Sequence, residues 1–400
     1  MKIPQGYKQT EFGAIPNDWV LCTFNDVLAT FSSGATPYRG IPEYYSGNVR
    51  WISSGELNYN VINDTIEHIS ENAVRNTHLR IHKPGTFLMA ITGLEAEGTR
   101  GKCAFVGAPS ATNQSCLAIN GTDKMCVEYL FWFYRMWGQY LAFKYCQGTK
   151  QQSYTAELVK RLPIYCPPTI EEQQKIAEAL SDVDKLIAAL DKKIAKKKLI
   201  KQAAMQQLLT GKKRLQGFSE EWRVVKIKDI FEITRGYVLP MSKLSEIKNG
   251  KFQYPVYSSQ TANNGIMGYY DDFLFEDSIT WTTDGANAGE VNYRSGKFYC
   301  TNVCGVLSST SGYANLCIAS ILNMCAKSYV SYIGNPKLMN NVMADIEIKI
   351  PETIQEQQAI SKILSDMDEE ILDLERKRDK HQLLKSGMMQ KLLTGQIRIK

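Results

Sequence analysis

Two long stretches of the chain carry apolar residues at alternating steps of four and three, the spacing of a coiled-coil seam. Neither stretch contains proline, so each is predicted to form one helix of about 42 residues, which is about 63 Å long at 1.5 Å per residue. A helix of that length overhangs a single domain and needs a partner along its apolar side. The seam residues are Ile176, Leu180, Val183, Ile187, Leu190 and Ile194 in the first stretch, and Ile360, Leu364, Met367, Ile371 and Leu374 in the second.

The two stretches are copies of each other. Residues 167–211 align without gaps on residues 351–395, and about half of the aligned residues are identical. Thr169 and Thr353 are each followed three residues later by glutamate, which is the capping-box spacing at a helix start. Gly211 and Gly395 stand where a left-handed residue ends a helix.

Charge predicts how the two helices pair. Residues 192–198 make the second half of the first helix basic, and residues 366–373 make the first half of the second helix acidic. Two similar halves that pack through equivalent surfaces place their helices antiparallel, and these two blocks then face each other. The alternative is that each helix lies on its own domain and the lysines form a solvated face.

The segments before the helices have the pattern of two mixed domains. Short apolar runs separated by Gly, Ser and Thr predict strands, and each set is followed by one apolar helix. Trp19 and Gly34 recur as Trp222 and Gly236 at matching places. The predicted strands are 49–52, 85–91, 102–106 and 116–119 before a helix at 126–145, and 252–257, 278–282, 289–293 and 304–307 before a helix at 314–332.

The sequence therefore predicts an α+β protein with an internal repeat. Two globular mixed α/β domains stand at opposite ends of an antiparallel coiled coil of two long helices. The predicted division is residues 1–166 for the first domain, 167–211 for the first helix, 212–350 for the second domain and 351–400 for the second helix.

Composition narrows the class of protein. A 44% hydrophobic and 22% charged chain is globular, and its net charge of +6 is compatible with a polyanionic partner without requiring one. The ten cysteines form no C-x-x-C pair and are expected to be buried thiols. We expect no metal site, no membrane span and a cytoplasmic location, and no motif marks a catalytic residue.

Short motifs stand in a fixed order along each half, and the helix motifs are duplicated. Each is weak alone, but their order and duplication are specific. They are Gly34-Ala-Thr-Pro37, Trp51-Ile-Ser-Ser-Gly55, Gly101-Lys-Cys-Ala104 and Thr112-Asn-Gln114 in the first half, Tyr254-Pro-Val-Tyr-Ser-Ser259, Gly268-Tyr-Tyr-Asp271 and Ser278-Ile-Thr280 in the second, and the two Glu-Gln-Gln helices that end in Leu-Leu-Thr-Gly.

In these motifs the chain resembles the specificity subunits of type I restriction-modification systems along almost its whole length. The resemblance implies that each domain reads one half of a split, asymmetric site in double-stranded DNA. It implies that the helices are spacers that dock two adenine methyltransferase subunits, and that two motor-nuclease subunits complete the restriction complex. S-adenosylmethionine, ATP and Mg would then be bound by those partners, with no cofactor and no catalysis on this chain.

Loops rich in hydrogen-bonding side chains are the candidates for DNA contact, because direct readout uses paired donors and acceptors while phosphates are held by Lys, Ser and backbone amides. The candidates are Thr36, Tyr38, Arg39, Thr99, Arg100, Lys102, Lys150, Gln151, Gln152, Ser153 and Tyr154 in the first domain, and Arg235, Tyr237, Ser258, Ser259, Gln260, Thr261, Thr283 and Asn287 in the second.

Two other functions remain open from the sequence. The modest net charge allows a coiled-coil scaffold that binds proteins and no nucleic acid, and an enzyme with an unrecognised site is the second alternative. Salt-dependent binding to duplex DNA distinguishes the first of these from a DNA reader.

Overall fold

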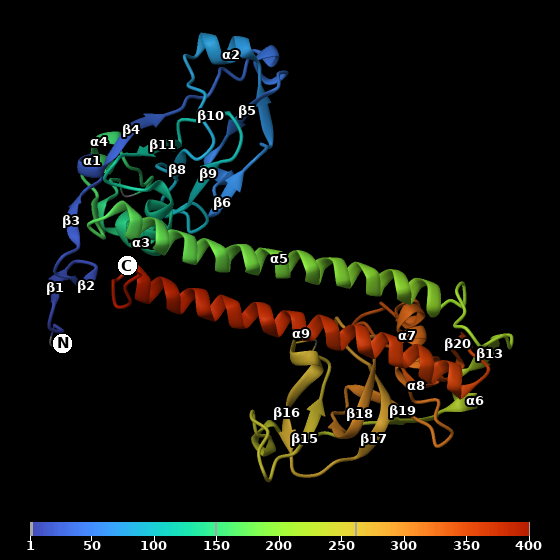
Figure 1. Ribbon diagram of the computed structural model, residues 1–400. Helices are drawn as coiled ribbons and strands as arrows, with labels where there is room; N and C mark the ends of the chain where they lie inside the picture. The colour runs from blue at the N-terminus through green and yellow to red at the C-terminus, as the bar shows by residue number, and fades with distance from the viewer. Residues whose placement is uncertain (1–2, 149, 261, 400) are drawn as a thin grey trace. The chain divides into compact units, whose positions relative to one another are not determined.

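A computed structural model describes residues 3–148, 150–260 and 262–399 (Figure 1). The chain divides into two compact units, Met1–Ala189 with Arg378–Lys400, and Leu190–Lys377. Each unit contains one globular domain and a part of each long helix. The long helices are α5, Ile170–Leu208, and α9, Ile354–Leu392. The predicted α+β class with long helices and a repeated domain is confirmed.

The remaining elements of the first unit make up its globular domain, here called the first domain. In chain order they are β1 Tyr7–Thr10, β2 Gly13–Pro16, β3 Val20–Thr23, α1 Phe24–Val27, β4 Leu28–Ser33, η1 Pro42–Tyr45, β5 Val49–Ile52, η2 Ser54–Glu56, β6 Asn60–Ile62, β7 Glu67–Ile69, α2 Glu71–Asn76, β8 Phe87–Ala90, β9 Cys103–Val106, β10 Ser110–Thr112, β11 Cys116–Gly121, α3 Val127–Tyr145, α4 Ala156–Lys160 and β12 Pro163–Cys166.

The second domain is built in the same way in the second unit. Its elements are β13 Arg223–Lys226, α6 Ile227–Ile230, β14 Glu232–Arg235, η3 Met241–Lys243, β15 Tyr254–Tyr257, η4 Ala262–Gly265, β16 Ile266–Tyr270, β17 Phe275–Thr282, β18 Val291–Cys300, β19 Cys304–Ser308, α7 Leu316–Cys325, η5 Ala326–Tyr329, α8 Asn340–Asp345 and β20 Glu347–Ile350.

The main sheets of the two domains have matching strand orders, β4-β11-β8-β9-β6 and β14-β19-β17-β18-β15-β16. In both sheets the first four strands are antiparallel to one another, and the fifth strand is parallel to the fourth. The registers also correspond, because Ala90 pairs with Cys116 in the first sheet and Thr282 pairs with Cys304 in the second. The repeat detected in the helices therefore extends through the domains, where little sequence is shared.

Each sheet is covered by the helix that follows it. In the first domain Phe131 of α3 stacks on Phe105 with ring centroids 4.9 Å apart, and Tyr134 packs edge-on against Phe87. In the second domain Ile318 and Leu322 of α7 share a buried cluster with Trp281.

The helix predicted at 314–332 is shorter than expected. It ends at Cys325, a single 3₁₀ turn follows, and Ser331 then pairs with Lys337 across a closed loop. Gly334 with a φ of +78° and Pro336 favour that turn over a continued helix.

Both long helices begin and end as the repeat predicts, with one exception. The Thr169 and Thr353 hydroxyls accept from the third amide of the first turn at 3.3 Å, and Gly211 and Gly395 are left-handed. The expected second half of each capping box is wrong, because the glutamate does not turn back to the helix start.

That glutamate instead holds an arginine that follows the other helix. In the first unit both carboxylate oxygens of Glu172 accept from Arg398, at 2.5 and 2.7 Å. In the second unit Glu356 accepts from Arg214, at 2.8 Å for each bond. The Glu172 and Glu356 side chains are only 6% and 1% exposed, so each pair neutralises a buried charge.

A tryptophan completes each of these clusters. The Arg214 guanidinium lies 5.9 Å from the ring of Trp222, and that of Arg398 lies 5.8 Å from Trp19. Trp222 follows Gly211 along the chain, whereas Trp19 comes from the other end of the chain and packs on Gly395. We call each set of Glu, Arg and Trp a clasp: Glu172, Arg398 and Trp19 form the first, and Glu356, Arg214 and Trp222 form the second.

Within each unit the two helix segments run antiparallel. In the first unit Ile176 and Leu180 share a core with Leu392 and Leu393, near the Asp184–Lys385 ion pair of 2.6 Å. In the second unit Lys197 pairs with Glu370 at 2.7 Å, Lys198 with Glu375 at 2.7 Å and Lys201 with Asp368 at 2.5 Å. The predicted meeting of the basic and acidic blocks is therefore found, with Glu375 and Lys201 as further members.

The two ends of each domain meet in one pair of antiparallel strands. β3 pairs with β12, with Val20 opposite Cys166, and β13 pairs with β20, with Arg223 opposite Ile350. The glutamine after each clasp glutamate forms a hydrogen bond at this junction. Gln173 and Gln357 are buried, and their amides donate to the carbonyl oxygens of Pro167 and Pro351.

Loss of either clasp arginine should destabilise the protein, because a buried carboxylate would remain without its partner. We expect Arg214→Ala and Arg398→Ala each to lower the free energy of unfolding by about 3 kcal/mol. Urea unfolding of the full chain measures this. Lys362→Ala, which removes an exposed pair with Asp366, is the control and should change the free energy by about 0.5 kcal/mol or less. Equal effects of all three variants would contradict the role of the clasps.

Asp184 makes a pH-dependent contribution to the stability of the first unit. Burial alone would raise its pKa, but Lys385 and Arg135 outweigh burial, and the pKa lies below its ordinary value of 3.8. A carboxylate with a lowered folded-state pKa contributes stability above the unfolded-state pKa, and the contribution is lost as pH falls through the folded-state pKa. Asp184→Asn should therefore lower the free energy of unfolding by about 1 kcal/mol at pH 7. This difference in unfolding free energy from the parent should stay constant down to about pH 5 and become smaller below about pH 4.

Urea unfolding of the parent and of Asp184→Asn across this pH range gives the measurement. Asp182→Asn is the matched control, since Asp182 is exposed and pairs with Lys185, three residues further along the same helix. A gap between Asp184→Asn and the parent that does not depend on pH would refute this assignment.

Candidate DNA interface

The predicted DNA-contact segments of the first domain gather at one end of its main sheet. Because neighbouring strands are antiparallel, β4 and β8 end where β9 and β11 begin. We call this the first loop end; it comprises residues 34–39, 91–102 and 113–115 and the Gln147–Ser153 loop.

Hydrogen bonds join these loops side by side. The Thr36 hydroxyl bonds to the Gln114 side-chain oxygen, and the Thr92 hydroxyl donates to that of Ser115 at 2.6 Å. Thr92 also forms a β-bridge with Ser153. The three predicted segments of the first domain thus form one surface.

Three of the basic candidates at this end, Arg39, Arg100 and Lys102, are paired within the domain. Arg39 donates both guanidinium nitrogens to Glu67, at 2.5 and 2.8 Å, and lowers the pKa of that carboxyl. Arg100 donates to two backbone carbonyls and lies 4.0 Å from the Phe143 ring. Lys102 donates to the Asn58 side chain at 2.9 Å. Arg100 shapes its own loop, whereas Arg39 is 59% exposed and can exchange partners at the surface.

The second domain has a corresponding second loop end where β14 and β17 end and β18 and β19 begin. It comprises residues 236–240, 258–260, 283–290 and 301–303 and the Ser331–Lys337 loop. Arg235 stands at its centre and donates to Asp284 at 2.8 Å, to Thr283 at 3.0 Å and to the carbonyl of Asn302. The Asn287 amide donates to the carbonyl of Ser259 at 2.8 Å. Thr261 lies outside the described residues.

One loop at each end leaves its sheet with the same backbone hydrogen bond. The amide of Ala35 donates to the Thr112 carbonyl at 3.2 Å, and that of Tyr237 donates to the Cys300 carbonyl at 3.1 Å. The preceding residues are Gly34 and Gly236, where a Cβ would come within 1.8 and 2.3 Å of those same carbonyl oxygens. The matching glycines in the sequence are therefore required by this close approach.

One loop of the second end was missed by sequence reasoning. Gln147 and Ser153 exchange two backbone hydrogen bonds in the first domain, and Ser331 and Lys337 do the same in the second. Ser153 bridges to Thr92, and Lys337 bridges to Asp284 at the equivalent strand end. The prediction of a helix through residue 332 concealed this loop, although Gly334 and Pro336 were a signal of a turn.

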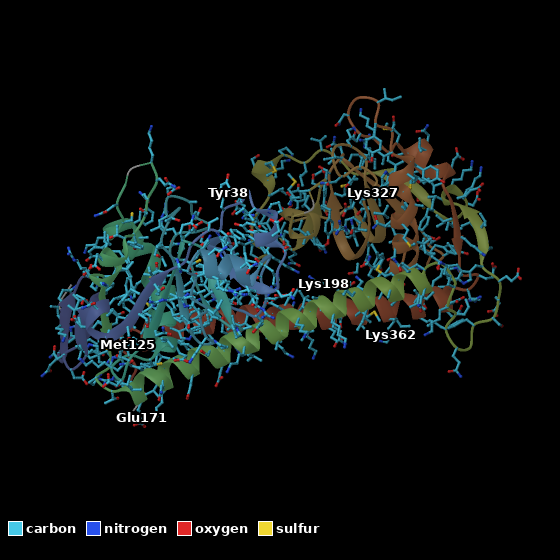
Figure 2. The ribbon with its side chains drawn as sticks, turned by 90° about the horizontal axis from the view of Figure 1, so that it is seen from above. Tyr38, Met125, Glu171, Lys198, Lys327 and Lys362 are labelled. Carbon is cyan, nitrogen blue, oxygen red and sulfur yellow. The ribbon has the colours of Figure 1, made fainter. Side chains whose placement is uncertain are left out.

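The candidate side chains differ widely in exposure. Tyr38 and Tyr237 are 72% and 63% exposed, and Figure 2 shows Tyr38 at the surface of the first domain. Tyr154 and Thr283, in contrast, are only 3% and 1% exposed and support the loops from within. The remaining candidates, Thr99, Lys150, Gln151, Gln152, Ser258 and Gln260, are exposed or half-buried.

The seam residues are also unequally buried. The first two of each helix, Ile176 and Leu180, and Ile360 and Leu364, are buried in the domain cores. Further along, Ile187, Ile194, Ile371 and Leu374 are buried, while Val183, Leu190 and Met367 are half-buried.

Most of the cysteine side chains lie in the domain cores. The cysteines are free thiols, most are buried, and burial raises the pKa of Cys126 to about 12. Among the described residues no group of His, Cys, Asp or Glu could hold a metal ion, and no described helix is long and apolar enough to cross a membrane.

Comparison with known proteins gives the family. The sequence model described as the type I restriction modification DNA specificity domain matches residues 16–199 and again residues 219–384. The chain is 27% identical over 430 residues to the MjaX type I restriction enzyme specificity subunit of Methanocaldococcus jannaschii, covering 99% of this chain and 97% of that protein. It is 46% identical over 130 residues to S.MpnORF289P of Mycoplasma pneumoniae, a type I specificity subunit N-terminus, covering 32% of this chain and 67% of that protein.

A solved structure shares the fold. The type I restriction-modification S subunit from M. genitalium superposes with a TM-score of 0.68 at 15% identity, covering 98% of both chains. With two matched copies of the specificity domain and the same arrangement of elements, the chain belongs to the family of type I restriction-modification DNA specificity subunits.

Proposed function

We propose that this specificity subunit reads a bipartite, asymmetric DNA site, with one half-site at each loop end, and that it is itself non-catalytic. The observation that carries the proposal is the pair of equivalent loop ends. The strand frame is the same in both domains, while the side chains at the loop ends differ. A common frame with different loops is suited to reading two different sequences by the same geometry.

We further propose that α5 and α9 dock two adenine methyltransferase subunits. Leu199 and Ile200 of α5 are 66% and 44% exposed, and their counterparts in the repeat, Leu383 and Leu384 of α9, are 76% and 50% exposed. Adjacent apolar pairs in water are typical of protein contact sites. Their duplication supports two copies of one partner. S-adenosylmethionine, ATP and Mg would be bound by the methyltransferase and motor-nuclease subunits.

Exchange of the second domain tests the division of the DNA site. Because Arg223 and Ile350 face each other in the β13–β20 pair, the segment 222–350 can be replaced at one junction. With the segment of another specificity subunit, complexes reconstituted with methyltransferase subunits should methylate a motif altered in one half only. Sequencing of the methylated DNA shows the motif. A change in both halves, or in neither, refutes the assignment of one half-site to each domain.

The same complexes test DNA binding itself. If phosphates are contacted, the affinity for duplex DNA falls steeply with salt concentration. A complex that assembles but shows no salt-dependent DNA binding would instead favour a protein-binding scaffold.

Substitution of the exposed apolar pairs tests docking. The double variant Leu199→Ser with Ile200→Ser should release one methyltransferase subunit. The double variant Leu383→Ser with Leu384→Ser should release the other subunit, and the variant with all four changes should release both. Native mass spectrometry of the reconstituted complex counts the subunits. Leu186→Ser is the control, because Leu186 is 43% exposed but its counterpart in the repeat is Glu370. Retention of both subunits by the fourfold variant would place docking elsewhere.

A further inference from the structure

The Ser331–Lys337 loop carries an exposed apolar tip. Tyr332 is 70% exposed and Ile333 is 95% exposed. An isoleucine so fully in water contributes nothing to the core, and beside a large aromatic ring it forms a small apolar projection.

Backbone hydrogen bonds and an ion pair fix the two ends of this loop to the second loop end. Ser331 and Lys337 exchange backbone hydrogen bonds of 2.8 and 2.9 Å. The Pro336 carbonyl accepts from Gly285 at 2.9 Å, and the Lys337 ammonium lies 3.8 Å from the Asp284 carboxylate. Asp284 is the residue that Arg235 holds, so the tip is tied to the centre of the second loop end.

The equivalent loop of the first domain has a different chemistry. It is closed at the same two positions, by Gln147 and Ser153, but Lys150 and Gln151 lie in its exposed part. The frame thus presents a basic, amide-bearing loop in one domain and an apolar one in the other.

We propose that Tyr332 and Ile333 make apolar contacts with base edges in the second half-site, an inference that rests on the proposed function. Apolar side chains read the thymine methyl group in the major groove and can wedge between base steps in the minor groove. DNA is favoured over a protein partner as the occupant because the tip shares its base with Arg235, Asp284 and Lys337. Its counterpart in the first domain carries side chains suited to phosphates and bases.

The test uses the full chain reconstituted with methyltransferase subunits and duplexes that carry the methylated motif. For Tyr332→Ser with Ile333→Ser we expect cognate affinity to fall about tenfold or more, as for a lost base contact. The slope of log affinity against log salt should not change, because apolar contacts release no counterions. Single base changes in the second half-site should lose their effect on binding, while those in the first half-site keep it.

Two control variants separate this effect from others. Ile247→Ser removes another exposed isoleucine of the same domain, and this variant should bind like the parent. Ile247 is 75% exposed and lies two residues after Ser245, which pairs with Tyr269 at the far end of β16. Lys150→Ala, in the first loop, should weaken binding to all sequences and reduce the salt slope.

Three results would overturn the inference. The double variant could bind the cognate duplex like the parent, or lose discrimination equally in both half-sites. It could also lose affinity because a methyltransferase subunit dissociates, which native mass spectrometry would detect and which would make the tip a protein contact. A parent complex that does not discriminate between sequences at all would be a failure of the proposed function instead.

Discussion

The buried pairing of a helix-start glutamate with an arginine beyond the end of the other helix is the constraint on which the structure depends. Glu172 and Glu356 are almost inaccessible to water, and a carboxylate in such a place is tolerable only with a paired cation. Arg398 and Arg214 supply that charge, and the geometry requires the end of one helix to lie beside the start of the other. The antiparallel pairing within each unit and the contact between the two ends of the chain at Trp19 and Gly395 both follow.

The clasps also explain how one frame can carry different loops. Gln173 and Gln357 tie each helix start to a two-stranded junction, and α3 and α7 pack the domain cores against the long helices. The loops at the two ends share their exits, as at Gly34 and Gly236, and the backbone closure of the Gln147–Ser153 and Ser331–Lys337 loops. Within those limits their lengths and side chains can vary, which is the variation that sequence reading needs.

The sequence predicted the parts of the fold that depend on local spacing. Helix ends at Thr169 and Gly211, strands such as 49–52, and the meeting of basic and acidic blocks all follow from short-range rules. The role of Arg214 and Arg398 does not follow from short-range rules, although both arginines stand three residues after the Leu-Leu-Thr-Gly motif. They reach the glutamates only in the folded chain. Local rules instead predicted a capping box, which uses the same glutamate.

The sequence predicted which loops form the candidate site, but not how their side chains are buried and paired. Thr36, Arg39 and Lys150 come from loops that do converge, since antiparallel neighbours place alternate strand ends together. The burial of Tyr154 and Thr283 and the partners of Arg235 depend on contacts distant in sequence. The Ser331–Lys337 loop was hidden by an apolar run that resembles the end of a helix.

The central claim is that both loop ends contact DNA at once. Hydrogen–deuterium exchange of the complex with methyltransferase subunits, with and without its methylated duplex, measures this most directly. The account predicts that DNA protects residues 34–39, 91–102, 236–240 and 283–290 but leaves unprotected the opposite ends of the same sheets, at residues 120–124 and 308–312. Protection at one loop end only, or at the opposite ends of the sheets, would contradict it.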